Sequence, residues 1–225
     1  MTENSTISFL LAGAGGFGRG VYHWLCDYAT ATYGPRGEAW EVRGFLDDDL
    51  TALEGFSGFP PIVSTIQDYR PEPGDRVVLA IGIPRIRKAV VKKLLEVDAT
   101  FETLIHPQAL VLSTAKVGLG SIVGPFSTIS DHAEVGDYAL VNSYSSIGHD
   151  VKIGAFCDLC PHAALSGFAR IDDDVFFGTS SVVVPGKSVG RGAQVAAGST
   201  VVRNTRPYSF VQGVPGKEVR DFFPK

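Results

Sequence analysis

The chain has 225 residues and a formal net charge of −4, and 44% of its residues are hydrophobic while 20% are charged. This is a globular composition, and the lack of a basic run excludes an electrostatic surface for nucleic acid or for a membrane. We therefore expect a small-molecule partner. Residues 1–8 carry no basic export segment, no apolar run reaches membrane-span length, and the three cysteines suit a reducing compartment, so we expect a cytoplasmic protein.

A strand, a glycine loop and a helix are predicted at the start of the chain. Residues 7–12 are apolar and of strand type, and residues 21 to 28 carry apolar side chains at helical spacing. Between them lie Gly13, Gly15, Gly16, Phe17 and Gly18. Such a loop lets a phosphate approach the first N–H groups of a helix, which predicts a nucleotide site.

Two further strands complete a small α/β domain over residues 1–104. A strand over residues 41–46 ends in Asp47 and Asp48, which could accept hydrogen bonds from the ribose or base of a nucleotide. Another, over residues 76–81, leads into Gly82 and a helix over residues 84–95. The glycine motif alone would also fit an NAD site, but about a hundred residues are too few for a full dinucleotide fold. We interpret the region as a half-size, Rossmann-like nucleotide domain.

A six-residue repeat runs through residues 105–204. An apolar residue recurs at every sixth position from Ile105 to Val201. Ala or Ser stands four positions after it in twelve of the seventeen repeats, and glycine directly follows the apolar residue in seven. A period of six fits a solenoid of short strands, three to a coil, with the glycines at its corners. Residues 205–225 follow as a C-terminal cap.

Coils of eighteen residues place side chains eighteen apart in one column. Asp131, His149 and Gly167 then stack, with His132 and Asp150 in the adjacent column. A histidine beside a carboxylate has the features of a general base, oriented here by either Asp150 or Asp131. The N–H of Gly167 could stabilise a developing oxyanion.

Other residues are interpreted without a catalytic role. Cys157 and Cys160 form one C-x-x-C at small-residue positions of the repeat, which favours packing over zinc or redox use. The histidines lie in different columns, so no metal site is expected. Phe126, Phe156 and Phe168 are interpreted as core or subunit contacts.

The repeat resembles that of the hexapeptide-repeat acyltransferases, whose fold is a left-handed parallel β-helix. The glycine loop, the acidic strand end, the Ala80-Ile81-Gly82 segment and the tail Gly213-Val214-Pro215-Gly216-Lys217 are similar to the NeuD/PglD type of sugar acyltransferase. Family members often carry His where Phe17 stands, and Ala where Gly216 stands. The fold expected from this resemblance is an α/β Rossmann-like domain followed by an all-β left-handed β-helix.

The resemblance also implies roles for particular residues. Asn142 through His149-Asp150 resembles the segment that carries the proposed base and its orienting acid, and Gly167 the glycine that meets the acetyl group. Substrate contacts would come from the glycine loop, Asp47, Asp48, Gly82, Arg87, Asp131 and Asn142. Coenzyme A contacts would come from Gly167, Pro185, Ala197 and Lys217, with Arg220 near its phosphates.

We therefore expect an acetyl-CoA-dependent N-acetyltransferase of a nucleotide-linked amino sugar, with acetyl-CoA as a co-substrate, no tightly bound cofactor and a homotrimeric state. O-acetylation of a sugar such as a sialic acid is an alternative that the sequence leaves open. A non-catalytic nucleotide-binding solenoid and an NAD enzyme remain alternatives from other classes.

Overall fold

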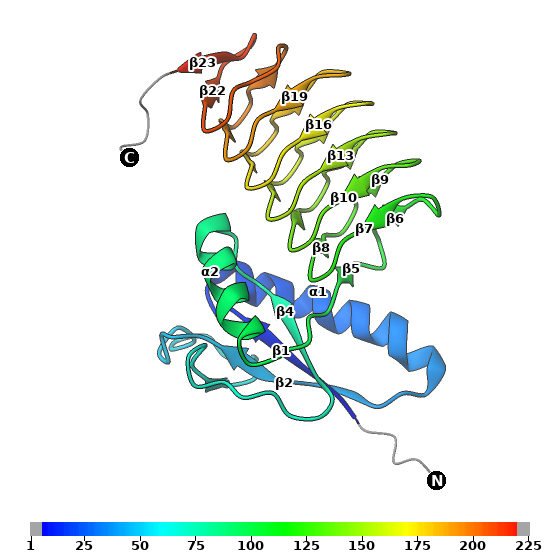
Figure 1. Ribbon diagram of the computed structural model, residues 1–225. Helices are drawn as coiled ribbons and strands as arrows, with labels where there is room; N and C mark the ends of the chain where they lie inside the picture. Colours follow the sequence, from blue (N-terminus) through cyan, green and yellow to red (C-terminus); the bar gives the residue numbers. More distant parts are fainter. Residues whose placement is uncertain (1–5, 220–225) are drawn as a thin grey trace. The chain divides into compact units, whose positions relative to one another are not determined.

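The computed structural model describes residues 6–219, and the chain divides between Pro107 and Gln108 into two compact units (Figure 1). We expected the boundary between residues 104 and 105, inside the short strand β5 (Leu104–Ile105). No helix among the described residues combines the length and the apolar character needed to cross a membrane.

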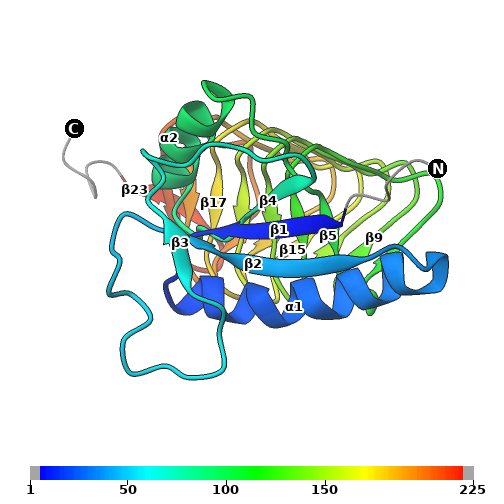
Figure 2. The same cartoon turned by 90° about the horizontal axis from the view of Figure 1, so that it is seen from below.

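The first unit is built on a four-stranded parallel sheet in the order β3-β2-β1-β4. The strands are β1 (Ile7–Ala12), β2 (Trp40–Leu46), β3 (Ile62–Ser64) and β4 (Asp75–Leu79). Helix α1 (Gly16–Tyr33), with the 3-10 turn η1 (Gly34–Arg36), and helix α2 (Pro84–Leu95) lie on opposite sides of the sheet (Figure 2). Because both faces are covered, Phe9, Leu10 and Leu11 are all fully buried and β1 is a continuous apolar run.

The connections of this unit create a crevice at the carboxyl ends of β1 and β4. The chain leaves β1 through α1 to reach β2 on one side, while β4 pairs with the other side of β1 and continues into α2. Loops from neighbouring strands therefore diverge at this point, which is where ligands bind in open α/β sheets. The sequence analysis missed β3, a three-residue strand between loops.

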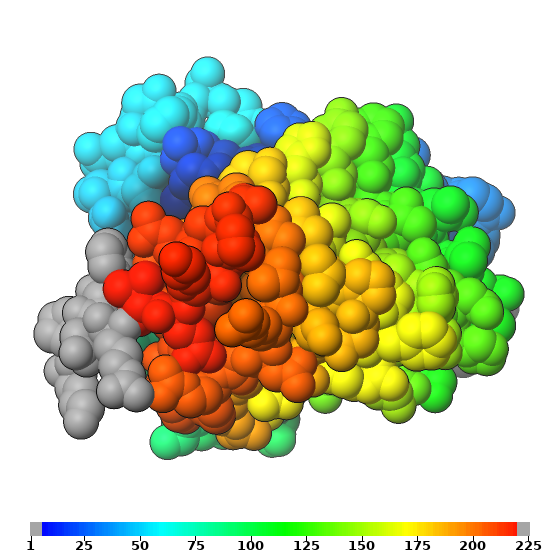
Figure 3. Space-filling model, turned by 90° about the horizontal axis from the view of Figure 1, so that it is seen from above, coloured from blue at the N-terminus to red at the C-terminus, as the bar shows by residue number. Residues whose placement is uncertain are grey.

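The second unit is a parallel β-helix of three sheets, and Figure 3 shows its coils following one another in chain order. One sheet contains β7 (Lys116–Val117), β10 (Glu134–Val135), β13 (Lys152–Ile153), β16 (Arg170–Ile171) and β19 (Ser188–Val189). A second contains β6 (Leu110–Val111), β9 (Thr128–Ile129), β12 (Ser146–Ile147), β15 (Ala164–Leu165), β18 (Val182–Val183) and β21 (Thr200–Val201). The third contains β8 (Ile122–Val123), β11 (Leu140–Val141), β14 (Asp158–Leu159), β17 (Phe176–Phe177) and β20 (Gln194–Val195).

Paired strands of successive coils are offset by eighteen residues, as predicted from the repeat. Glu134 pairs with Lys152, Leu140 with Asp158, and Ser146 with Ala164. The second residue of each of these strands points inward and is buried, as at Val135, Val141 and Ile147. The buried serines of the repeat join coils, since Ser127 Oγ donates to the carbonyl of Asn142 and accepts from the N–H of Ser145.

The corners of the β-helix differ from the expectation. The left-handed backbone conformation recurs every six residues, but mostly at non-glycine residues: Phe126, His132, Tyr138, Tyr144, Asp150, Phe156, His162, Phe168, Asp174 and Ser180. The glycines that follow the apolar residue lie two positions before these left-handed residues. They allow the backbones of successive coils to approach each other closely. A Cβ on Gly136 would lie 2.6 Å from the carbonyl carbon of Gly154 in the next coil.

Two of the outer faces of the β-helix differ in the charge of their side chains. The face of β7, β10, β13 and β16 carries Lys116, Glu134, Lys152 and Arg170, with ion pairs between successive coils. The face of β6 to β21 carries only uncharged side chains at the corresponding positions, which are Leu110, Thr128, Ser146, Ala164, Val182 and Thr200. We call this second surface the uncharged face.

The tail extends the β-helix. Strand β22 (Phe210–Gln212) pairs parallel with β20, and β23 (Lys217–Val219) returns antiparallel to β22. Within the region expected to form a C-terminal cap, residues 210–212 therefore add a strand to the third sheet, and residues 217–219 pair with that strand in the reverse direction.

Two glycine-to-alanine substitutions test the close approach of the coils. Gly136→Ala should reduce the free energy of unfolding by about 1–3 kcal/mol, because the new methyl group meets backbone atoms of the next coil. Gly20→Ala, inside α1 where a Cβ meets nothing within 4 Å, should raise it by up to about 1 kcal/mol. Urea unfolding followed by circular dichroism measures both, and an equal change in the two variants would contradict the packing described.

Candidate active site

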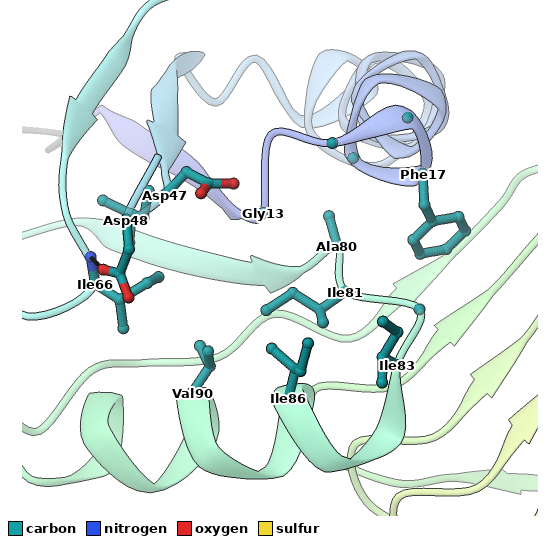
Figure 4. A pocket seen from close by; sticks show the side chains of 15 residues that line it. Gly13, Phe17, Asp47, Asp48, Ile66, Ala80, Ile81, Ile83, Ile86 and Val90 are labelled. Carbon is teal, nitrogen blue, oxygen red and sulfur yellow. Dashed lines mark hydrogen bonds between the residues drawn. The ribbon is translucent and has the colours of Figure 1, made fainter. Parts of the chain in front are cut away.

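A cavity of about 490 Å³ occupies the crevice of the first unit (Figure 4). Its walls come from the glycine loop, the ends of β2 and β4, and α2. The lining residues are Gly13, Gly15, Gly16, Phe17, Gly18, Leu46, Asp47, Asp48, Ile66, Ala80, Ile81, Gly82, Ile83, Ile86 and Val90. All of the predicted substrate contacts of this unit except Arg87 line the cavity. Ile86 is 43% exposed and is among the lining residues.

The glycines of the loop have distinct tasks. Gly13 has a φ of +107°, and Gly18 packs so closely that a Cβ would lie 2.0 Å from the carbonyl oxygen of Gly13. Gly15 has open space where a Cβ would be. Helix α1 has no side-chain cap and no acidic residue in its first turn, so its amino end presents N–H groups to the cavity. Such an end favours an anion such as a diphosphate.

Asp47 holds the loop in place. Its Oδ2 accepts a hydrogen bond from the backbone N–H of Ala14 at 2.7 Å, and its Oδ1 accepts from the N–H of Asp49 at 2.9 Å. Both carboxylate oxygens therefore have backbone partners, and the role of Asp47 here is to tie the end of β2 to the glycine loop.

Asp48 is more open to the cavity than Asp47. Its Oδ1 accepts from the backbone N–H of Ile66 at 3.0 Å, while its Oδ2 lies 4.0 Å from Nζ of Lys93. Figure 4 shows the carboxylate at the end of the cavity away from Phe17, near Ile66 and Val90.

Arg87 supports the cavity from behind. Its side chain is buried, and Nη1 donates to the carbonyl oxygen of Ile81 at 2.7 Å. The structure does not place it among the lining residues, whereas Gly82 is among them. The contact of Arg87 stabilises the turn that carries Ile81 and Gly82.

His149 lies at a corner of the β-helix, in the turn between β12 and β13. Its Nδ1 is 2.9 Å from Oδ2 of Asp150, and its side chain is 57% exposed. Because a carboxylate only accepts, this contact assigns the proton of a neutral imidazole to Nδ1 and leaves Nε2 free to accept a proton.

Gly167 stands one coil above His149, as the column prediction requires. An alanine methyl group there would lie 2.6 Å from Nε2 of His149, so only glycine leaves the ring's reactive edge unobstructed. Among the hydrogen bonds between described residues, the N–H of Gly167 has no acceptor, while its carbonyl accepts from Gly186 N at 3.0 Å. The acceptor nitrogen of His149 and the N–H of Gly167 thus belong to residues that lie against each other in successive coils.

Asp131 lies one coil below His149 but has other partners. Thr114 Oγ1 donates to Oδ1 of Asp131, and its Oδ2 is 3.8 Å from Nε2 of His132. Of the two carboxylates considered from the sequence, Asp150 is the one in hydrogen-bond contact with His149.

Phe168 is a neighbour of His149 to which the sequence analysis gave no functional part. Its ring packs edge-on against the imidazole, with centroids 4.9 Å apart, and its N–H donates to the carbonyl of His149. The sequence could have indicated this neighbour, because Phe168 follows Asp150 by eighteen residues and therefore lies in the same column.

The remaining predicted contacts are dispersed. Pro185 is exposed in the column of Gly167, whereas Ala197 is exposed at a different corner, one coil beyond Thr179. Asn142 Oδ1 accepts from the N–H of Ser143, away from His149. Lys217 lines a second cavity of about 360 Å³ with Arg203, Asn204 and Gly216. Arg220 lies outside the described residues.

The cysteines of the C-x-x-C lack the features of a reactive pair. Burial, followed by the charge of Asp158, raises the pKa of Cys160 to about 11, so its thiol stays protonated near neutral pH. Cys157 is buried, and its Sγ donates to the carbonyl of Asp172. Within residues 6–219 no group of three or more His, Cys, Asp or Glu side chains could hold a metal ion.

The first unit is Rossmann-like, and the amino end of its helix α1 has no side-chain cap. The second unit is a β-helix with a His–Asp pair at a corner. This combination is the architecture of the left-handed β-helix acyltransferases. Residues 8–94 match the family model described as the PglD N-terminal domain. Together with the matches below, this makes the chain similar to the hexapeptide-repeat sugar acyltransferases of the NeuD/PglD type, and its fold is an α/β domain followed in the chain by a left-handed parallel β-helix.

Similar proteins extend the likeness to between 62% and 95% of this chain. A GDP-perosamine N-acetyltransferase of Escherichia coli O157:H7 is 28% identical over 139 residues, which span 62% of this chain and 63% of that protein. The acetyltransferase domain of PglB from Neisseria gonorrhoeae FA1090 is 27% identical, with a TM-score of 0.84 over 95% of this chain and all of that one. PerB from Caulobacter crescentus, solved with CoA and GDP-perosamine, is 27% identical, with a TM-score of 0.77 over 94% and 97% of the two chains.

The hydrogen bond that Asp47 accepts from Ala14 predicts that replacing Asp47 lowers the free energy of unfolding, by an amount that depends on whether the new side chain can still accept it. Asp47→Ala leaves the N–H of Ala14 without its partner and should reduce the free energy of unfolding by about 1–3 kcal/mol. Asp47→Asn keeps one carbonyl oxygen for this N–H and should lose less. Chemical denaturation of the two variants measures the difference, and equal losses would show that the hydrogen bond to Ala14 does not stabilise the loop.

Proposed function

We propose that the protein is an acetyl-CoA-dependent N-acetyltransferase that acts on the amino group of a nucleotide-linked amino sugar. The observation that carries the proposal is the corner at His149, where Asp150 holds Nδ1 and a glycine stands against Nε2. The similar proteins named above support the substrate class, because their names and bound molecules combine an acetyltransferase with CoA and GDP-perosamine.

Each residue of the corner has a part in the proposed reaction. The nitrogen lone pair of the sugar amine attacks the carbonyl carbon of the acetyl thioester, and the carbonyl oxygen gains negative charge. The N–H of Gly167 donates a hydrogen bond to this oxygen. Nε2 of His149 takes the proton that the amine loses, and Asp150 stabilises the imidazolium that results. The C–S bond then breaks, and coenzyme A leaves as the thiolate, so that no acyl-enzyme is formed.

The proposal places the sugar nucleotide and the coenzyme on different elements. The nucleotide occupies the cavity at the glycine loop, with its diphosphate at the amino end of α1. Coenzyme A runs along the column of Gly167 and Pro185. Ala197 and Lys217, on other parts of the β-helix, would contact coenzyme A if it lies between two subunits.

We propose a homotrimer on the basis of the uncharged face. It is bordered on one side by the corner of His149 and on the other by a stack of three rings, Phe126, Tyr144 and His162, with centroids 5.0 Å apart. Tyr144 is 53% exposed. A face without charged side chains suits a buried contact between copies, and three copies related by a threefold axis would each bury it. A cytoplasmic location belongs to the same proposal, since the cysteines of the chain are unpaired.

The test is the release of coenzyme A from acetyl-CoA with matched pairs of nucleotide-linked sugars, one with an amine and the other with a hydroxyl at the same carbon. We expect release with the amine only. Release with the hydroxyl would favour sugar O-acetylation, and no release with any sugar would favour a non-catalytic solenoid.

Replacement of His149 tests the proposed base in the same assay. His149→Ala should lower kcat by about 10²- to 10⁴-fold, as expected for loss of a general base. His132→Ala is the matched control, because His132 is exposed at the same corner one coil below and its Nε2 lies 3.8 Å from Oδ2 of Asp131. A wild-type rate in His149→Ala, or an equal loss in both variants, would contradict the assignment.

A further inference from the structure

We propose that Phe168 is a positioning residue for the general base, because its ring fixes the orientation of the His149 imidazole. In that orientation Nδ1 meets the carboxylate of Asp150, and Nε2 lies against Gly167. The inference rests on the proposed function for the role of His149 as a base. The orientation itself is a property of the folded chain, so it can be measured without a substrate.

The imidazole of His149 needs more than one contact to stay in place. Its side chain is 57% exposed, and the side chain of its partner Asp150 is 41% exposed. Exposed side chains change rotamer within picoseconds to nanoseconds, and exposed ion pairs contribute little stability. A single hydrogen bond at Nδ1 also leaves the ring free to turn about that bond. A base whose Nε2 must meet one particular proton therefore requires a second contact.

Phe168 provides this second contact. The phenyl and imidazole rings are nearly perpendicular, at 88°, and their centroids are 4.9 Å apart. Such a T-shaped geometry is one of the favoured arrangements of aromatic pairs. Oδ2 of Asp150 holds one edge of the imidazole, while the phenyl ring limits the tilt of its plane. The two contacts together restrict the imidazole to the orientation in which Nε2 faces the coil above.

The ring of Phe168 does not follow the pattern of the aromatic residues at the other corners. Those residues stack within their own columns, with ring planes 27° or less apart: Phe126 on Tyr144, Tyr144 on His162, and Tyr138 on Phe156. The column of Phe168 contains no aromatic neighbour, because Asp150 lies one coil below and Gly186 one coil above. Its ring packs instead against His149 in the adjacent column. The contact is therefore a feature of this corner and not of the stacking repeat.

Backbone contacts hold the corner independently of the phenyl ring. The N–H of Phe168 donates to the carbonyl of His149 at 3.0 Å, and Nη1 of Arg170 donates to the carbonyl of Asp150. Removal of the ring leaves both hydrogen bonds in place. Phe168 is also 54% exposed, so its truncation removes little buried apolar surface. A change in the imidazole or in turnover would therefore not be a consequence of unfolding.

The first experiment measures which imidazole nitrogen carries the proton, from two-bond ¹H–¹⁵N spectra of the full chain at a pH where His149 is neutral. His149→Ala assigns the signal. In the wild type we expect the proton mainly on Nδ1, because the carboxylate of Asp150 only accepts. In Phe168→Ala we expect a larger share on Nε2, because the imidazole is then free to turn away from Asp150. An unchanged distribution would overturn the inference.

The second experiment measures turnover by coenzyme A release. Phe168→Ala should lower kcat by about 2- to 10-fold, the range that the loss of one aromatic contact provides. The KM values for both substrates and the melting temperature should not change. Phe168→Tyr keeps the ring, and its hydroxyl group can reach water, so it should keep the wild-type kcat.

Tyr208→Ala is the matched control for the loss of an exposed ring. Tyr208 is 77% exposed and has a left-handed backbone, but its ring lies against Gly192 at another corner. Its kcat should equal that of the wild type. A wild-type kcat in Phe168→Ala, an equal fall in Phe168→Tyr or Tyr208→Ala, or a lower melting temperature of Phe168→Ala would contradict a positioning role.

The two measurements separate this inference from the proposed function. A changed proton distribution in Phe168→Ala, in a protein that releases no coenzyme A with any amino sugar, would keep the orienting contact and remove the transferase. An unchanged distribution in an active enzyme would remove the role of Phe168 while His149 could still act as the base.

Discussion

The eighteen-residue stacking of the coils is the constraint on which the proposed chemistry depends. Hydrogen bonds between successive coils fix the register, as in the pairing of Ser146 with Ala164, so a residue's column follows from its number. This register brings Gly167 against the imidazole of His149 although eighteen residues separate them. A rigid solenoid can hold such a pair without a mobile loop, which suits a reaction that depends on the position of one proton acceptor and one N–H donor.

The repeat and the strand–loop–helix start could be predicted from sequence, because both are periodic patterns with a direct structural meaning. The corner conformation could not. Glycine at positions such as Gly136 suggested the bend, yet the left-handed residues lie two positions on and include Tyr144 and His162. Aromatic residues seldom adopt this conformation alone. Stacking of their rings from coil to coil accompanies it here, and this is a tertiary effect that no local sequence window contains.

The acidic cluster shows the same limit at the candidate site. Asp47, Asp48 and Asp49 are adjacent and chemically identical, and sequence reasoning assigned the first two to substrate. In the structure Asp47 bonds the backbone at Ala14 and Asp49, Asp49 bonds Thr51, and Asp48 keeps an oxygen near the cavity. Likewise the sequence left open whether His149 is oriented by Asp131, one coil below it, or by Asp150, next to it in the chain, and only the side-chain contacts favour Asp150. Backbone position is readable from the repeat, whereas the choice of hydrogen-bond partner depends on rotamers.

The most direct test of this account is the turnover number of Gly167→Ala. The three atoms nearest to the added methyl group would all belong to the His149 imidazole, with Nε2 at 2.6 Å, so the methyl group should displace the ring rather than the stacked backbone. The account predicts a fall in kcat of about 100-fold or more, with no fall in melting temperature. A wild-type kcat in this variant would contradict the claim that the register of the coils assembles the catalytic corner.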